Sequence, residues 1–145
     1  YARFVTKALA DLGHVKHREP YQRLFHQGMI TRNGSKISKR GNPLSPDDWI
    51  EKYGSDVLRM YLMFMGPFDQ WGDWSDRGIS GPERFTKRIY EMISERYDAS
   101  FEDDDMEVLT ALHKSIKKVG EDIEKLHFNT ALASLMETLN VVNKR

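Results

Sequence analysis

Four basic side chains in a short polar segment indicate a site for phosphate. The segment between residues 31 and 43 has almost no apolar residues and is punctuated by Asn33-Gly34 and Gly41-Asn42-Pro43. Its bases are Arg32, Lys36, Lys39 and Arg40. A basic loop of this kind loses conformational freedom on ordering, and a bound anion such as phosphate would compensate for that loss. On charge alone, however, a solvated surface loop explains the segment better.

The glycines and lysines of this segment do not form a P-loop. That motif places four residues between two glycines and a Lys directly after the second. Here five residues separate Gly28 from Gly34, and Ser35 stands before Lys36. A P-loop nucleotide site is therefore excluded.

The net charge of zero conceals two halves of opposite sign. The chain of 145 residues has 22 Lys and Arg against 22 Asp and Glu. Residues 1–45 hold nine of these bases and two of the acids, a balance of +7, so residues 46–145 carry −7. Neutrality of the whole chain thus does not exclude a nucleotide or a nucleic acid as partner.

Other chemistries find little support in the residue types. The absence of cysteine excludes disulfides, zinc–thiolate sites and thiol catalysis. The histidines in the basic part, His14, His17 and His26, lack metal-ligand spacing, so no metal site is expected. Three consecutive acids at 103–105 fit charge compensation at a helix start better than a Mg²⁺ site. Lys114, Lys117 and Lys118 favour a solvated helix face.

The elements that must position the basic segment flank it on both sides. Residues 1–12 form a helix that Gly13 ends, residues 21–25 form a helical turn or two, and residues 28–30 form a brief strand. Ser45 and Pro46 begin one helix, and a second, apolar on almost every face, runs from Ser55 to Met65. Residues 68–81 read as an ordered connection anchored by Trp71 and Trp74.

Beyond Pro82 the chain predicts three amphipathic helices. Their apolar residues advance by three and four positions, as on one face of an α-helix. The first set is Phe85, Ile89, Met92 and Ile93; the second is Met106, Leu109, Leu112, Ile116, Val119, Ile123 and Leu126; the third is Leu132, Leu135, Met136, Leu139 and Val142. Short connections between such helices predict part of a helical bundle.

The basic segment and the two helices after it resemble the second signature of class I aminoacyl-tRNA synthetases. Residues 36–42 read Lys-Ile-Ser-Lys-Arg-Gly-Asn, and residues 50–59 read Ile-Glu-Lys-Tyr-Gly-Ser-Asp-Val-Leu-Arg. The family has Lys-Met-Ser-Lys-Ser, then Gly-Asn and a Glu-Lys-Tyr-Gly-Ala-Asp-x-Leu-Arg helix pair. The flanks Tyr1-Ala-Arg-Phe, Leu24-Phe25-x-Gln27-Gly28-Met29 and Arg59-Met-Tyr-Leu-Met-Phe-Met-Gly66-Pro67 look like the leucyl-tRNA synthetases within this class.

This resemblance implies that residues 36–40 form the loop that closes over ATP. Lys36 and Lys39 match the two motif lysines and would be catalytic, while Lys36, Ile37, Ser38, Lys39 and Arg40 would bind the phosphates. Ile37 in place of Met keeps an apolar anchor, and Arg40 in place of Ser adds a phosphate donor. ATP with Mg²⁺, leucine and tRNA(Leu) would be the ligands, and contact of Lys114, Lys117 and Lys118 with the tRNA is the lesser alternative to a solvated helix face. A cytoplasmic monomer without a membrane segment is expected.

The expected fold class is mainly α. Residues 1–80 would be the C-terminal part of a Rossmann-type catalytic domain, and residues 81–145 the start of a helical anticodon-binding domain. The family's first signature, His-Ile-Gly-His, does not occur in the chain, so the chain is expected to be a fragment without activity by itself. The alternative is a stand-alone helical RNA-binding or scaffold module derived from a synthetase.

Overall fold

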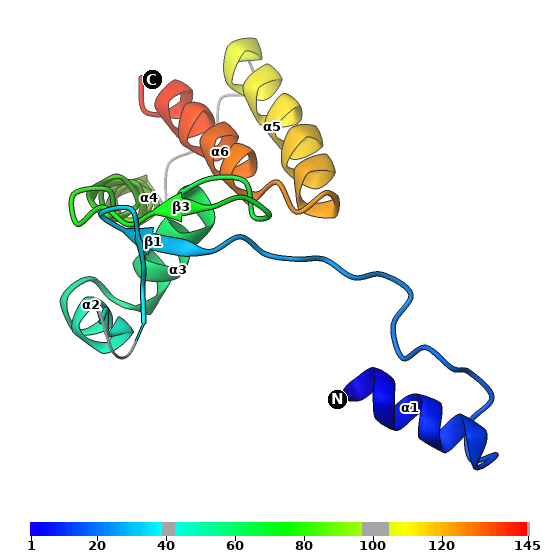
Figure 1. The fold of residues 1–145 in the computed structure, drawn as a ribbon. Helices are drawn as coiled ribbons and strands as arrows, with labels where there is room; N and C mark the ends of the chain where they lie inside the picture. The colour runs from blue at the N-terminus through cyan, green and yellow to red at the C-terminus, as the bar shows by residue number, and fades with distance from the viewer. Residues whose placement is uncertain (39–42, 97–104, 145) are drawn as a thin grey trace.

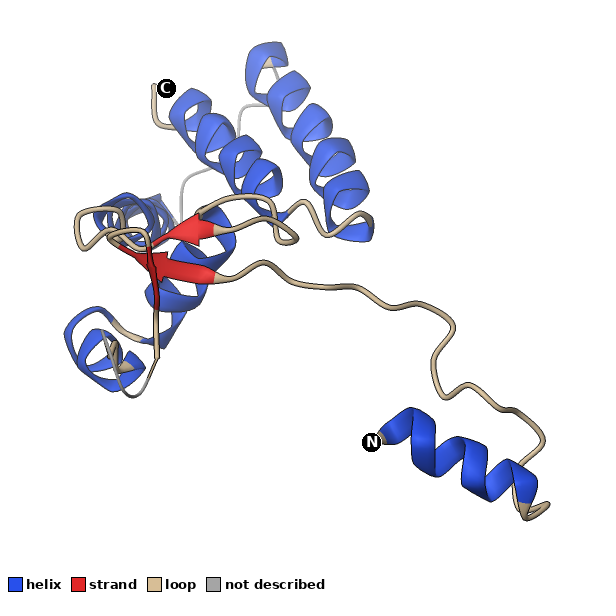
Figure 2. Ribbon diagram, viewed as in Figure 1, coloured by secondary structure: helices blue, strands red, loops and turns tan. Residues whose placement is uncertain are grey.

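The chain folds into six helices and a small sheet in the part that the structure describes. The structure is a computed structural model and describes residues 1–38, 43–96 and 105–144. In chain order the elements are α1 (Ala2–Asp11), β1 (Ile30–Arg32), β2 (Ser35–Lys36), α2 (Pro46–Tyr53), α3 (Ser55–Phe64), β3 (Gly72–Asp73), α4 (Ser80–Arg96), α5 (Met106–Glu124) and α6 (Phe128–Val142). Figures 1 and 2 show a mainly helical molecule with the strands near its centre, as predicted.

Helix α1 lies apart from the rest of the molecule. A long extended segment joins it to β1 (Figure 1), and none of its residues is buried. It ends where expected, because Gly13 takes a φ of 79° and the His14 N–H donates to the Leu9 carbonyl. The expected helical turn at residues 21–25 is wrong. This stretch is extended, and the Phe25 ring stacks on Phe68 at 5.8 Å.

The three strands form one sheet in the order β2-β1-β3. Strands β1 and β2 are an antiparallel hairpin whose two turn residues, Asn33 and Gly34, have φ of 53° and 73°. Strand β3 adds in parallel to the other side of β1. The expectation of a loop over residues 31–36 is wrong, because these residues form the hairpin, and β1 pairs in addition with a strand about 40 residues later in the chain.

The core gathers on one face of α3. Val57, Leu58 and Tyr61 are buried there together with Trp74 and Ile79 from the following connection. An α-helix that is apolar on almost every face is expected to be buried on all sides, and this expectation is wrong for α3, since Leu62 and Met63 are exposed. Helix α2 begins as predicted, with the Ser45 hydroxyl accepting from the Asp47 N–H at 3.3 Å.

The C-terminal helices pack as a pair and a single helix. Helices α5 and α6 form an antiparallel hairpin, while α4 packs on α3, which also contacts α6. The predicted α5 is confirmed, but part of its apolar stripe is exposed. Val108, Ser115 and Asp122 are buried, whereas Ile116 of the stripe remains 68% exposed. In residues 1–38, 43–96 and 105–144, no helix is long and apolar enough to cross a membrane.

Candidate functional site

The hairpin β1–β2 carries the start of the basic loop. Lys36 ends β2 with its side chain exposed, and it pairs with Thr31 of β1. Ile37 follows and packs, half-buried, against the core around α3. Ser38 is exposed. The other two predicted site residues, Lys39 and Arg40, lie outside the residues that the structure describes.

Thr31 holds the hairpin to strand β3. It is the central residue of the sheet, 7% exposed, with Lys36 opposite on one side and Asp73 opposite on the other. Its hydroxyl donates to Oδ1 of Asp73 at 2.7 Å, and the N–H of Gly34 in the turn donates to the same oxygen at 3.2 Å. These two bonds lower the pKa of the Asp73 carboxyl, because they stabilise its charged form.

A second carboxylate, Asp76, joins the hairpin to the connection after β3. Nη2 of Arg32 lies 3.0 Å from Oδ2 of Asp76, and the indole Nε1 of Trp74 donates to Oδ1 at 2.8 Å. The Trp74 N–H donates to the Thr31 carbonyl at 2.7 Å. Asp73 therefore accepts from two residues of the hairpin, whereas Asp76 accepts from Arg32 of the hairpin and from Trp74 of the connection.

An aromatic cluster fixes this arrangement to helices α2 and α3. The Trp74 ring lies edge-on to both Trp49 and Tyr61, with centroids 4.9 Å away in each case. The Tyr61 hydroxyl donates to the Ser75 carbonyl at 2.9 Å and accepts from the Ser75 N–H at 3.0 Å. Trp74 is 4% exposed, whereas Trp71 is 71% exposed, so only Trp74 pins the connection.

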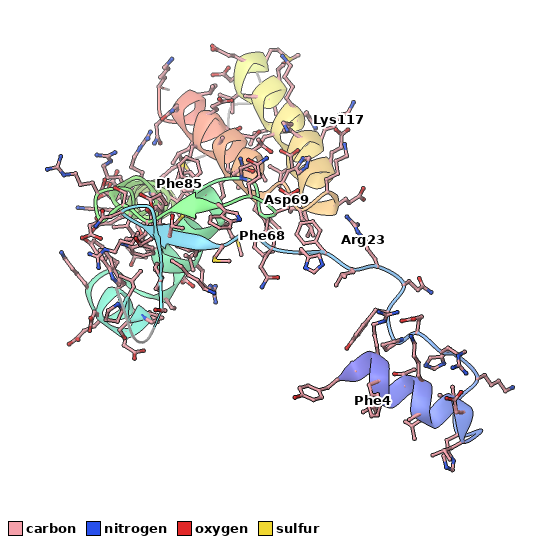
Figure 3. All side chains as sticks on the ribbon, viewed as in Figure 1. Phe4, Arg23, Phe68, Asp69, Phe85 and Lys117 are labelled. Atoms are coloured by element: carbon pink, nitrogen blue, oxygen red, sulfur yellow. The ribbon has the colours of Figure 1, made fainter. Side chains whose placement is uncertain are left out.

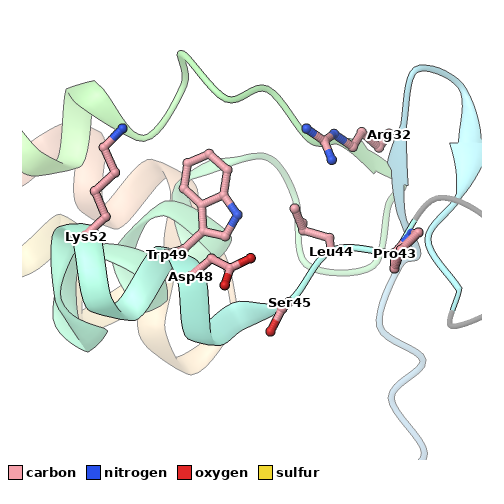
Figure 4. A pocket seen from close by; sticks show the side chains of 7 residues that line it. All are labelled: Arg32, Pro43, Leu44, Ser45, Asp48, Trp49 and Lys52. Atoms are coloured by element: carbon pink, nitrogen blue, oxygen red, sulfur yellow. The ribbon is translucent and has the colours of Figure 1, made fainter.

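A polar hollow of about 290 Å³ opens beside the hairpin (Figure 4). Its basic side chains are Arg32 of β1 and Lys52 in the last turn of α2, and Asp48 and Trp49 of α2 line it between them. The remaining lining residues are Pro43, Leu44 and Ser45. The hollow thus adjoins the residues that directly follow the basic loop.

Sequence reasoning identified the loop but missed what supports it. Of the predicted site residues, the structure describes Lys36, Ile37 and Ser38, at the end of the hairpin. Thr31, Asp73 and Asp76 were not singled out, because the acids fall in a connection whose tryptophans suggested a purely structural role. The available signal was the pair of acids, Asp73 and Asp76, on either side of Trp74, which could have indicated carboxylates held near the core. Among the described residues, no group of three or more His, Cys, Asp or Glu side chains could hold a metal ion.

Comparison with known proteins gives a consistent result. The family described as tRNA synthetases class I (I, L, M and V) matches residues 3–75. Curated relatives named "Leucine--tRNA ligase" include those of Dehalococcoides mccartyi, 44% identical over 99% of this chain, and Thermosipho melanesiensis, 47% identical over 97%. The chain spans only 18% of the length of each of these relatives.

Solved structures agree with the sequence comparison. The ternary complex of Agrobacterium radiobacter K84 agnB2 LeuRS, tRNA and LeuAMS contains a region similar to 98% of this chain, with a TM-score of 0.84 and 30% identity, over 20% of that chain. Methionyl-tRNA synthetase of Mycobacterium tuberculosis shares the fold over 79% of this chain and 26% of its own, with a TM-score of 0.61 and 22% identity. The chain belongs to the class I tRNA synthetases, in the family that the I, L, M and V enzymes share.

Proposed function

We propose that this chain is the part of a leucine–tRNA ligase that carries the ATP-closing loop and the first helices of the anticodon-binding domain. The observation that carries the proposal is the 44% identity, over 99% of the chain, to a relative named for that activity. The hairpin supports it, because β1 and β2 present Lys36 and the residues after it at one edge of the sheet.

The reaction would begin with activation of leucine. A carboxylate oxygen of leucine attacks the α-phosphorus of ATP, the bond to the bridging oxygen of the β-phosphate breaks, and pyrophosphate leaves with the electron pair. Lys36 and Lys39 would donate hydrogen bonds to the charge that develops on the leaving pyrophosphate. Ile37, Ser38 and Arg40 would complete the phosphate-binding loop. Mg²⁺ is expected to accompany the ATP phosphates and neutralise part of their charge.

The second step would transfer leucine to tRNA(Leu). A hydroxyl of the tRNA 3′ end attacks the carbonyl carbon of leucyl-adenylate, and AMP leaves. In this proposal residues 1–80 belong to the catalytic domain and residues 81–145 to the helical domain that meets the tRNA. The protein would act as a monomer in the cytoplasm.

We further propose that the 145 residues alone do not catalyse activation. The first signature, His-Ile-Gly-His, does not occur in them, and the chain matches 18% of the length of its relatives. The rest of the nucleotide site and the leucine pocket would lie in residues that this chain does not contain.

Leucine-dependent exchange of pyrophosphate into ATP tests the proposal. The full-length gene product is expected to exchange with leucine and not with isoleucine, valine or methionine, whereas the 145-residue chain is expected to give no exchange. A full-length product that binds tRNA without any exchange would overturn the ligase proposal and favour the RNA-binding module. Exchange by the isolated chain would contradict its proposed inactivity.

A further inference from the structure

We infer that Asp73 is a positioning residue for Lys36, holding the hairpin that carries the basic loop. The inference rests on the proposed function, since it assigns Asp73 a part in leucine activation through Lys36. Asp73 lies 37 positions after Lys36 in the chain, and only the sheet brings the two together.

Lys36, Thr31 and Asp73 form one row across the sheet. Thr31 is paired with Lys36 of β2 and with Asp73 of β3. Residues directly opposite in neighbouring strands point to the same face of a sheet, so the three side chains share one face. Two strand spacings put the backbone of Asp73 about 9.5 Å from that of Lys36.

The Asp73 carboxylate ties together two points of the hairpin. Oδ1 accepts from the Thr31 hydroxyl at 2.7 Å and from the Gly34 N–H at 3.2 Å. Gly34 takes a φ of 73°, so the turn geometry depends on this residue, and Lys36 follows two positions later. Fixing Thr31 and Gly34 therefore fixes the path of the chain into Lys36.

Asp73 is itself held in place by its neighbours. The Gly72 N–H donates to the Met29 carbonyl at 3.1 Å, and the Trp74 N–H donates to the Thr31 carbonyl at 2.7 Å. Trp74 is buried in the aromatic cluster, so the backbone of Asp73 is attached to the core. Because the backbone at Asp73 is attached to the core and its carboxylate is bonded to the turn, Asp73 restrains the hairpin.

The test uses the full-length enzyme and leucine-dependent pyrophosphate exchange, normalised to active sites by titration. A misplacement of about 1 Å can cost about 10²-fold in rate, so Asp73→Ala is expected to lower kcat by about tenfold to a hundredfold with an unchanged KM for leucine. Asp73→Asn keeps an acceptor oxygen and should stay within about threefold of wild type. Asp69→Ala, in the same connection and exposed (Figure 3), is the control and should leave kcat unchanged.

A double-mutant cycle separates positioning from general stability. If Asp73 acts through Lys36, Asp73→Ala should cost less than about twofold further in a Lys36→Ala background. A full additional loss there would overturn the inference, as would wild-type kcat in Asp73→Ala.

Amide hydrogen exchange tests the hydrogen bond between Asp73 and the Gly34 turn without relying on enzyme activity. In the full-length protein, Asp73→Ala should speed amide exchange in the peptide that contains Gly34, and Asp73→Asn should not. If wild type shows no leucine-dependent exchange of pyrophosphate, the proposed function fails, and with it the part of Asp73 in leucine activation. Unchanged amide exchange in an otherwise active Asp73→Ala variant would instead refute the tie between Asp73 and the turn.

Discussion

At the scale of single residues, the site combines exposed cations with carboxylates that have defined partners. Lys36 is exposed, whereas Asp73 accepts hydrogen bonds from Thr31 and Gly34, and Asp76 accepts them from Arg32 and Trp74. This division suits the proposed function, because a group that acts on a substrate must be held accurately in place.

Lys39 is expected to act on the transition state more than on bound leucine. In the full-length enzyme, Lys39→Ala should lower kcat for leucine activation by about 10²–10³, with a much smaller change in leucine binding. Pyrophosphate exchange at varied leucine concentration measures both quantities. Lys87→Ala, an exposed lysine on α4, is the control. An unchanged kcat in the Lys39 variant would remove this lysine from catalysis.

Asp122 should make the stability of the chain depend on pH in the acid range. Lys118 Nζ donates to its carboxylate at 2.6 Å and the Thr130 hydroxyl donates at 2.7 Å, which lowers its pKa. The unfolded chain therefore takes up this proton at a higher pH than the folded chain. The stabilisation is present above the unfolded pKa, about 3.9, and is lost as the pH falls through the lower folded value.

Urea unfolding of wild type and Asp122→Asn at pH 7, 5, 4 and 3 measures this contribution. The difference in free energy of unfolding between them should be largest at the higher pH values and should shrink toward pH 3. Glu121→Gln, which removes the neighbouring exposed carboxylate on α5, is the control. A difference that stays constant with pH would contradict the assignment.

At the scale of elements, the connection between α3 and α4 joins the sheet, the core and α3. It supplies β3 to the sheet, Trp74 to the core and the Ser75 backbone to the Tyr61 hydroxyl. Phe68 extends this role, since its ring stacks on Phe25 and meets Phe128 of α6 edge-on at 5.7 Å. Segments before and after the loop are thus joined through a stretch with very little regular structure.

Two glycines three positions apart, Gly78 and Gly81, test how closely the connection packs against Tyr61. A Cβ on Gly78 would lie 2.7 Å from the Tyr61 hydroxyl oxygen, and that ring is buried and bonded to Ser75. Gly78→Ala is therefore expected to destabilise the chain by about 1–3 kcal/mol in urea unfolding.

Gly81 provides the matched control, because a Cβ there meets nothing within 4 Å and the residue lies in α4. Gly81→Ala should stabilise the chain by about 0.4–1 kcal/mol, since it restricts the unfolded state. Equal effects of the two substitutions would argue against the close Tyr61–Gly78 contact.

At the scale of the whole molecule, the chain consists of a packed body and a detached helix. The apolar side chains of α1 are exposed, with Phe4 at 76%, and Figure 3 shows that residue away from the side chains of the body. An ion pair between Arg3 and Glu19, with both bonds at 2.7 Å, ties α1 only to its own extended segment and lowers the pKa of Glu19 to about 2.

Removal of residues 1–20 should leave the body intact. All three tryptophans lie between residues 49 and 74, so their fluorescence reports unfolding of the body. The urea midpoint is expected to be unchanged, and binding of an apolar dye should fall because an exposed apolar face is lost. A lower midpoint would mean that α1 stabilises the body in solution.

Local sequence patterns accounted for most of the helices and for the position of the basic segment. The Ser45 cap, the end of α1 at Gly13 and the extent of α3, α5 and α6 follow from interactions within a few residues, which the residue order specifies. The motif around Lys36 is a run of consecutive residues, and the absence of cysteine follows from the composition.

Tertiary structure decided which faces are covered and what holds the loop. The partners of Thr31 lie 5 and 42 positions away along the chain, and the strands that join them have two or three residues, too few for a periodic signal. The buried face of α5 likewise depends on α6 and includes Ser115 and Asp122 as well as Val108, while Ile116 of the apolar stripe is exposed. The sequence by itself determined the helices, the loop and its charge. The row from Lys36 to Asp73 arose only on folding, because side chains distant along the chain meet only once the backbone pairs.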